Sequence, residues 1–402
     1  MVPSIKIEDY NYNLPDERIA KYPLAQRDSS KLLYYSPDRD ISCHGFTELP
    51  SYIDENSLMF FNDTKVVPAR LFFRRASGAH IEVFCLEPSE PSDYNVCFAS
   101  TSTCVWKCVV GNVKRWKGDV LSCFDPDGRL SNIALKASLV ERMGQTSLVR
   151  FDWNGGLPFS QVLEMCGNVP IPPYLNRETE PIDYERYQTL YAKERGSVAA
   201  PTAGLHFSQR VLAELENKGV DCRRVCLHVG AGTFLPVKDS DVARHPMHRE
   251  PFIIKTAELE ALARGDRPVV AVGTTSVRTL ESLYYAGVSI IETGNVCDVE
   301  QWSPYIREYG YSTKESLEAI VAYLKQRGLD ALELGTRIII VPGFKFRIVD
   351  KLVTNFHQPQ STLILLVSAF VGGDWRRIYD FALENDFRFL SYGDSSLLCK
   401  HL

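Results

Sequence analysis

The sequence lacks the features of a membrane or secreted protein. No run of apolar residues reaches the ~18–20 positions that cross a bilayer. Residues 1–17 carry several acidic side chains, whereas a secretory signal peptide begins with a basic region followed by an apolar one. We therefore expect a soluble cytoplasmic protein without a membrane partner.

Patterns of metal-binding or disulfide-bonded cysteines are also missing. The eleven cysteines are odd in number, are scattered over the chain and include no CxxC pair. His245 and His248 have a spacing that suits zinc, but Pro246 disfavours a regular helix and no second half-site follows. We therefore expect reduced thiols that pack as small hydrophobic side chains, and no metal site.

The chain also lacks a strong charge of either sign. It is 45% hydrophobic and 24% charged, so 402 residues can bury a sizeable core, and we expect two domains in a monomer. A net charge of −5 excludes a surface that is basic all over, but phosphate contacts require only a local basic face. Basic residues cluster at 70–75, 114–117, 223–224 and 376–377, and each cluster fits a solvated surface as well.

Residues 74–153 differ in sequence pattern from the rest of the chain. Short β-rich runs such as HIEVFCLE and CVWKCVVGN alternate with turn signals, the pattern of a small antiparallel barrel or sandwich. After residue 158, buried strands alternate with helices. The sequence therefore predicts an α/β fold built from residues 1–73 and 154–402, with a second domain inserted at 74–153.

Local signals predict several individual elements. We expect a short helix at 12–23, because a proline followed by two acidic residues opens it and a second proline ends it. A capping box predicts a packed helix within a helical stretch at 301–337. Wholly apolar runs predict buried strands at 269–272 and within 337–346.

The segment RDSSKLL, residues 27–33, joins the first predicted helix to a strand. Arg27, Ser29, Ser30 and Lys31 bring several hydrogen-bond donors to one junction. They fit a solvated turn and an anion-binding site equally well, and both interpretations stay open.

Two stretches of small residues indicate a ligand-binding site. SVAAPTAGLHF at 197–207 and HVGAGTF at 228–234 each combine glycine, histidine and an aromatic residue, a composition that lets the backbone pass close to a ligand. His206, His228 and His357 fall in such turns, where active sites of α/β folds gather at strand ends. One histidine in such a turn is commonly structural, whereas several such turns favour a site.

Residues 269–287 predict a strand, a Gly-Thr-Thr-Ser turn and a helix. Backbone N–H groups and the helix dipole point at such a turn, which makes it an anion site. It matches neither the GxxxxGK[ST] nor the GxGxxG pattern of nucleotide loops. Arg278 lies in the first helical turn, where a cation is unfavourable unless an anion offsets it, so it is a candidate carboxylate clamp. Phe207, Phe356 and Tyr392 accompany these turns and fit either ligand stacking or core packing.

Eleven motifs follow one another in a family-specific order. They are YNLPDERIA, RDSSKLL, FFNDTKVVPARL, PPYL, ERYQTLYA, SVAAPTAGLHF, HVGAGTF, HPMHRE, AVGTTSVRTLES, VTNFHQPQST and FRFLSYGD. Over nearly its whole length the chain resembles the S-adenosylmethionine:tRNA ribosyltransferase-isomerase family of queuosine biosynthesis. Several of these motifs are long and unusual, which makes chance agreement remote.

The resemblance implies a fold, a reaction and substrates. The family has an α/β domain with a small antiparallel β-barrel inserted, in agreement with the change of texture at 74–153. It transfers and isomerises the ribosyl part of S-adenosylmethionine onto 7-aminomethyl-7-deazaguanine at the tRNA wobble position, which gives epoxyqueuosine and releases adenine and methionine. S-adenosylmethionine is then a co-substrate, no cofactor stays bound, and tRNA is the partner.

This chemistry requires a base for a proton on C5′, a donor for departing adenine and an anion site for the methionine carboxylate. Because imidazole titrates near neutral pH, the catalytic candidates are His206, His228 and His357. The carboxylate is assigned to Thr275, Ser276 and Arg278, and the cationic sulfur to Phe207 or Phe356. The other predicted substrate-binding residues are Thr202, Gly204, Gly230, Gly232, Thr233, Asn355, Tyr392 and Asp394.

Some features depart from the commoner members of the family. Gln358, Ser395 and Ser396 replace leucine, alanine and methionine, and 301–337 looks like an added helical insertion. These departures leave room for a shifted tRNA or base preference. Two other functions also fit: a catalytically inactive tRNA-binding relative, and an S-adenosylmethionine-dependent transferase that acts on a small molecule.

Overall fold

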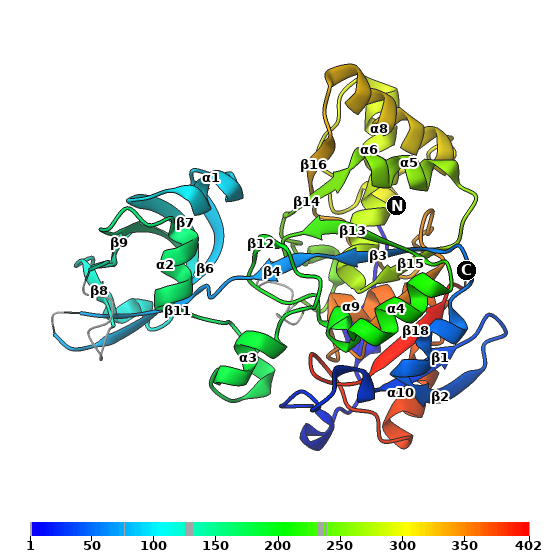
Figure 1. The fold of residues 1–402 in the computed structure, drawn as a ribbon, viewed down its shortest axis with the longest axis horizontal. Helices are drawn as coiled ribbons and strands as arrows, with labels where there is room; N and C mark the ends of the chain where they lie inside the picture. The colour runs from blue at the N-terminus through cyan, green and yellow to red at the C-terminus, as the bar shows by residue number, and fades with distance from the viewer. Residues whose placement is uncertain (1, 76, 125–131, 231–236, 238, 402) are drawn as a thin grey trace.

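A nine-stranded mixed sheet runs through the main body of the molecule, and a separate barrel lies to one side of it (Figure 1). The computed structural model describes residues 2–401 except 76, 125–131, 231–236 and 238. In spatial order the strands of the sheet are β16 (Ala331–Thr336), β14 (Glu250–Lys255), β13 (Asp221–Leu227), β3 (Leu58–Asn62), β15 (Val269–Val272), β17 (Lys351–Asn355), β18 (Ser395–Cys399), β1 (Lys31–Tyr35) and β2 (Ile41–Gly45).

Strand direction gives the sheet two distinct edges. β13, β3, β15 and β17 are mutually parallel neighbours, so all four end at one edge, which we call the carboxyl edge. β18 runs antiparallel to β17 and parallel to β1, so β18 and β1 begin at that same edge. The opposite edge, where the four parallel strands begin, is the amino edge.

Helices cover both faces of the sheet. The helices of this main body are α3 (Pro181–Arg186), α4 (Gln209–Asn217), α5 (Thr256–Arg264), α6 (Thr274–Thr293), α7 (Ser303–Ile306), α8 (Thr313–Arg327), α9 (Thr362–Phe370) and α10 (Trp375–Glu384), with 3-10 turns that include η2 (Asp16–Arg18), η3 (Arg27–Ser29), η4 (Phe46–Tyr52) and η7 (Thr202–His206). Leu58 and Phe60 of β3 join the core formed with α6, whereas Met59 and Phe61 join the core formed with α4 and η4. Burial on both faces explains why β3 is apolar at successive positions instead of alternating.

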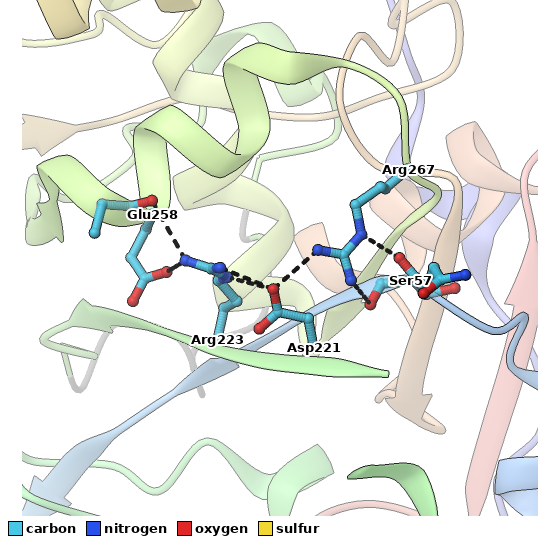
Figure 2. A network of polar contacts seen from close by, with 7 residues as sticks. Ser57, Asp221, Arg223, Glu258 and Arg267 are labelled. Carbon is cyan, nitrogen blue, oxygen red and sulfur yellow. Dashed lines mark hydrogen bonds and ion pairs between the residues drawn. The ribbon is translucent and has the colours of Figure 1, made fainter. Parts of the chain in front are cut away.

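A network of ion pairs fastens the amino edge (Figure 2). Asp221, at the start of β13, accepts hydrogen bonds from Arg223 Nη2 at 2.8 Å and Arg267 Nη1 at 2.9 Å. Arg223 also pairs with Glu258 of α5 at 2.8 Å, and Arg267 donates to the carbonyl of Ser57 just before β3. The network therefore joins the beginnings of neighbouring strands to the helix above them.

The barrel is a closed antiparallel sheet of six strands with a short seventh strand added. Closure comes from pairing of β5 with β8. Its elements are β5 (Arg70–Arg74), β6 (His80–Glu90), α1 (Tyr94–Ala99), β7 (Thr103–Val110), β8 (Leu121–Cys123), β9 (Lys136–Met143), β10 (Thr146–Asp152), α2 (Phe159–Cys166) and β11 (Gly167–Asn168). The parallel pair β4 (Thr64–Val66) and β12 (Glu194–Ser197) lies between barrel and main body.

The predicted fold class, an α/β fold with an inserted antiparallel β-barrel, is confirmed. The domain limits at residues 74 and 153 stay predictions. The strand at 269–272 is confirmed as β15, and α8 has the predicted capping box of Ser312 and Glu315. Among the described residues, no helix combines the length and apolar character that crossing a bilayer demands.

Two predicted elements are wrong. The segment 12–23 contains only the single turn η2, because Ile19 pairs instead with Phe389 in an isolated bridge. Residues 338–341 are buried as expected but form no strand, and the strand of this region, β16, lies just before them within the stretch predicted as helical. Their backbone groups bond outside any ladder: Ile339 N–H donates to the carbonyl of Gln301, and Tyr305 Oη accepts from Val341 N–H.

Candidate functional site

A pocket opens at the carboxyl edge of the sheet. We call it the central pocket. Its walls come from residues 200–203, 229, 273–275, 354–358, 361, 363, 390 and 391 together with Tyr174. These residues come from the ends of β13, β15 and β17, from η7, from the start of α9 and from the turn before β18, so segments far apart in the sequence meet in one cavity. A crevice at the carboxyl ends of parallel strands is where α/β folds commonly bind ligands.

The N-terminus of α6 forms one wall of the central pocket. Gly273, with φ of 89°, makes the sharp turn from β15 into the helix, a conformation that glycine adopts without steric cost. No side chain of the described residues caps the helix, and the N–H groups of its first turn have no partners within the helix. Thr275 is buried and its Oγ1 has no hydrogen-bond partner among the described residues, whereas Ser276 Oγ donates to the carbonyl of Val272. Thr275 therefore offers an unused hydroxyl to the pocket, and the Ser276 hydroxyl is already engaged.

His357 belongs to the same pocket. Its ring lies 3.0 Å from Thr354 Oγ1 through Nε2, and its backbone is held by Tyr379 and Tyr12. Nδ1 has no hydrogen-bond partner within the part of the chain that the structure describes. Burial lowers the pKa of His357 to about 3, so the ring is neutral at physiological pH and keeps an acceptor lone pair available.

His206 lies behind the wall of the central pocket. Asn355 uses both hydrogens of its amide group on the carbonyls of Leu390 and Ser391, so its Oδ1 must accept the hydrogen bond from His206 Nε2 at 3.2 Å. Nδ1 of the ring then accepts from Ser30 Oγ at 2.8 Å. Burial lowers the pKa of His206 to about 4, in agreement with this neutral tautomer. Both ring nitrogens therefore form hydrogen bonds that join Ser30 and Asn355 across the wall.

His228 contacts the barrel. Its ring stacks on Tyr94 of α1, with centroids 4.6 Å apart and 12° between planes. A Cβ at Gly196 would lie 2.6 Å from His228 Nδ1, so only glycine leaves room for the ring. Burial lowers the pKa of His228 to about 4. The three predicted catalytic histidines thus do not share one pocket: only His357 lines the central pocket.

Arg278 faces a second cavity, the side pocket, which Gly230, His245 and His248 also line. Its guanidinium forms a buried ion pair with Glu250, and its Nε donates to the carbonyl of Ile338 at 3.1 Å. Nη2 of Arg278 is buried and has no partner among the described residues. Leu363 lines both cavities. Arg278 and Thr275, predicted together as one anion site, therefore lie in adjoining pockets.

The remaining predicted residues divide between lining and packing positions. Thr202, Asn355 and Phe356 line the central pocket, whereas Phe207 is fully buried against other aromatic rings. A Cβ at Gly204 would lie 2.0 Å from the Tyr191 hydroxyl, so this glycine serves close packing.

The Tyr-Gly-Asp turn is held by its own polar contacts. Tyr392 Oη donates to Asp183, and Asp394 pairs with Arg388 at 2.8 Å. Gly232 and Thr233 lie outside the described residues.

Sequence reasoning missed Tyr174 and Ser391 as lining residues. Both line the central pocket, and their hydroxyls hydrogen bond to each other. Each stands in a recognised motif, PPYL or FRFLSYGD, so the motifs carried the signal even though neither side chain had an assigned role. Among the described residues no group of three or more histidine, cysteine or acidic side chains has the geometry to hold a metal ion.

Comparison with known proteins gives a consistent family. A family model described as "Queuosine biosynthesis protein" matches residues 7–398. S-adenosylmethionine:tRNA ribosyltransferase-isomerase of Trichlorobacter lovleyi is 38% identical over 98% of this chain and 99% of its own, and that of Aromatoleum aromaticum is 36% identical over 98% of each chain. The crystal structure of S-adenosylmethionine tRNA ribosyltransferase from Thermotoga maritima aligns over 97% of this chain and 99% of that chain, with 27% identity and a TM-score of 0.46.

Proposed function

Because the chain belongs to the S-adenosylmethionine:tRNA ribosyltransferase-isomerase family of queuosine biosynthesis, we propose that it modifies the wobble position of tRNA. In this reaction the ribosyl group of S-adenosylmethionine is transferred and isomerised onto 7-aminomethyl-7-deazaguanine. The products are epoxyqueuosine in tRNA, adenine and methionine. The observation that carries the proposal is the central pocket, where an uncapped helix N-terminus, the unpaired Thr275 hydroxyl and neutral His357 line the same cavity.

The N-terminus of α6 is our site for the methionine carboxylate. A carboxylate there would accept hydrogen bonds from the first-turn N–H groups and from Thr275 Oγ1. Among the described residues that line the pocket, none has an acidic side chain that would repel it. Ser276 contributes its backbone N–H, because its hydroxyl is engaged with Val272. Arg278 stands one turn farther along α6, but Glu250 offsets its charge, so its free group in the adjoining pocket is the unpaired Nη2 donor.

Phe356 is our choice for the contact with the cationic sulfur. Its ring lines the central pocket and is held among Tyr379, Phe387 and Phe389, with centroid distances of 4.9–5.5 Å. A sulfonium near an aromatic face gains a favourable cation–π interaction. Phe207, the other candidate, packs edge-on against Phe46 and Phe61 and lies outside the pockets described.

His357 is our candidate for the base that removes the C5′ proton. We assign the neutral tautomer in which Nε2–H donates to Thr354 Oγ1, which leaves the Nδ1 lone pair available to accept the proton. The lowered pKa of about 3 also makes it a weak base. The reaction therefore depends on the acidity that the neighbouring sulfonium gives to C5′, and on holding the proton and Nδ1 at hydrogen-bond distance.

A single experiment separates this function from its alternatives. The protein is incubated with S-adenosylmethionine and tRNA bearing 7-aminomethyl-7-deazaguanine, and the nucleosides are analysed by mass spectrometry. Epoxyqueuosine with stoichiometric adenine supports the proposal. Binding of tRNA without adenine release identifies an inactive relative, and consumption of S-adenosylmethionine without tRNA identifies a small-molecule transferase; either result contradicts the proposal.

A further inference from the structure

A group of arginines lies beside the central pocket and has no part in the reaction described above. We call their cavity the arginine pocket. Arg27 of η3, Arg186 of α3 and Arg388 line it, and no acidic side chain is among its lining residues. Arg27 belongs to the RDSSKLL segment, for which the sequence left a solvated turn and an anion site open.

Two of these arginines have no carboxylate within ion-pair distance among the described residues. Arg388 pairs with Asp394 at 2.8 Å. Within the part of the chain that the structure describes, Arg27 and Arg186 form no ion pair and donate to backbone carbonyls instead. Arg27 Nη1 donates to Gln188 at 2.8 Å, and Arg186 Nη2 donates to Leu24 at 2.7 Å. Carbonyl dipoles orient the guanidinium groups but do not neutralise them, so both arginines present positive charge to the cavity.

The guanidinium groups also have unused binding capacity. Nε of Arg186 is buried and has no hydrogen-bond partner among the described residues. Arg27 and Arg186 line the same cavity, and the pKa of Arg27 is lowered first by burial and then by the positive charge of Arg186, although the Glu185 carboxylate opposes the shift. An anion between them would remove this repulsion and accept charge-assisted hydrogen bonds.

Only a thin wall separates the arginine pocket from the central pocket. His206 lines the arginine pocket and hydrogen bonds to Asn355, which lines the central pocket. Ser391 lines both cavities. An anion in the arginine pocket would therefore lie one residue layer away from a base bound in the central pocket, as a backbone phosphate does in a nucleic acid.

We propose that the arginine pocket binds the tRNA backbone phosphate adjoining the nucleotide whose base enters the central pocket. The proposal rests on the proposed function, because ribosyl transfer requires the tRNA base to reach S-adenosylmethionine in the central pocket. A phosphate contact of this kind fixes the position of the nucleotide without reading its sequence. Arg27 and Arg186 are the ligands. Arg388 lines the same cavity and is paired with Asp394.

The same arginines also join distant segments of the fold. An experiment must therefore distinguish a structural role from a phosphate contact. Arg27 reaches from η3 to the α3 segment, and Arg186 reaches back to residues 24 and 25. A purely structural role predicts that Arg186→Gln lowers stability and weakens all RNA binding equally. A phosphate contact predicts a loss tied to one particular phosphate.

The test is a double-mutant cycle between protein and RNA. The RNA is an anticodon stem-loop with 7-aminomethyl-7-deazaguanine at the wobble position, made with a neutral methylphosphonate at the 5′ or the 3′ phosphate of that nucleotide. Dissociation constants are measured for the wild type, Arg186→Gln and the control Arg210→Gln. Arg210 is exposed, pairs with Asp28 at 3.0 Å and does not line the arginine pocket, so its replacement removes one positive charge nearby without removing a lining residue.

We expect one of the two methylphosphonates to weaken wild-type and Arg210→Gln binding about tenfold, the size of one charged hydrogen-bond contact. Arg186→Gln should lose this sensitivity, because its contact is already absent. The slope of log Kd against log salt for the unmodified RNA should also decrease by about 0.7 in Arg186→Gln.

The proposal would be overturned if a methylphosphonate weakened binding equally in the wild type and Arg186→Gln. It would also be overturned if neither methylphosphonate weakened binding by the wild type. The substitution on the RNA leaves the wild-type protein intact, so poor folding of the variant cannot mask that second outcome. Failure of the proposed function is a separate result: the wild type would bind the stem-loop, with or without the coupling, and form no epoxyqueuosine.

Discussion

The two edges of the central sheet differ in how completely their polar groups are paired. At the amino edge, Asp221, Arg223, Glu258 and Arg267 satisfy one another in a network of ion pairs (Figure 2). At the carboxyl edge, the α6 N-terminus is uncapped and Thr275 Oγ1 has no partner among the described residues. The parallel strands thus begin beside a paired network and end beside unpaired donors and neutral histidines.

This contrast indicates a division of labour. A buried donor or acceptor without a partner costs about 1–3 kcal/mol of stability, and natural folds rarely leave one without a reason. We infer that unpaired groups at the carboxyl edge bind ligand at a cost in folding stability. The ion pairs at the amino edge compensate for part of this cost. Substitutions at the two edges should therefore separate catalysis from stability.

The largest effect is expected for His357→Ala. Removal of the proposed base should lower kcat by about 10²–10⁴-fold, with little change in KM for S-adenosylmethionine. The matched control is His401→Ala, because His401 follows the end of β18 at the amino edge and bonds to the carbonyl of Ser36. Single-turnover formation of epoxyqueuosine checks both variants. A His357→Ala rate within threefold of the wild type would rule out His357 as the base.

Acid should destabilise the carboxyl edge first. Burial lowers the pKa values of His206 and His228 to about 4 and that of His357 to about 3, below the ordinary value of 6.5. Below pH 6.5 the unfolded chain therefore binds more protons than the folded protein. The free energy of unfolding falls as pH decreases from 6.5 toward 4. The slope is about 1.4 kcal/mol per pH unit for each histidine, or up to about 4 kcal/mol in total at pH 5.5.

The amino edge should respond at lower pH. Burial opposes ionisation of Asp221, but hydrogen bonds from Arg223 and Arg267 prevail and hold its pKa below the usual value of 3.8. Its contribution is therefore present above that value and is lost only as pH falls below it. Urea unfolding between pH 2 and 8 measures the difference. A stability that stays flat from pH 6.5 to 5 would show that the histidines are not held neutral.

Thr275→Val should weaken S-adenosylmethionine binding about tenfold, because one hydrogen bond to the carboxylate is lost. Stability should stay equal or rise, since the change removes an unpaired buried hydroxyl and keeps the side-chain shape. Thr279→Val is the control in the same helix, because Thr279 Oγ1 donates to the carbonyl of Thr275 and is fully buried. Calorimetric titration measures both affinities. Equal affinity of the two variants would remove Thr275 from the carboxylate site.

Arg267→Gln should have the smallest effect, and this effect should be on stability and not on catalysis or binding. The partly exposed pair with Asp221 is screened by solvent, so we expect a loss of about 1 kcal/mol in the free energy of unfolding and an unchanged kcat. Arg264→Gln, an exposed position in the same region, should change stability by less than about 0.5 kcal/mol. A selective fall in kcat for Arg267→Gln would contradict the division between edges.

The sequence predicts what depends on local pattern and misses what depends on distant partners. The strand, turn and helix around Gly273 follow from neighbouring residues, and so does the α8 capping box of Ser312 and Glu315. The stacking of His228 on Tyr94 requires the barrel to meet the end of β13, which no local signal contains. The placement of Arg278 in the side pocket likewise depends on Glu250, a distant position in the chain.

The most direct test of this account is the crystal structure of the protein with S-adenosylmethionine bound. We predict that the ligand occupies the central pocket, with its carboxylate within hydrogen-bond distance of Thr275 Oγ1 and of the first-turn N–H groups of α6, and with C5′ facing His357 Nδ1. A ligand bound away from the carboxyl edge, or one whose carboxylate does not contact the start of α6, would contradict the account.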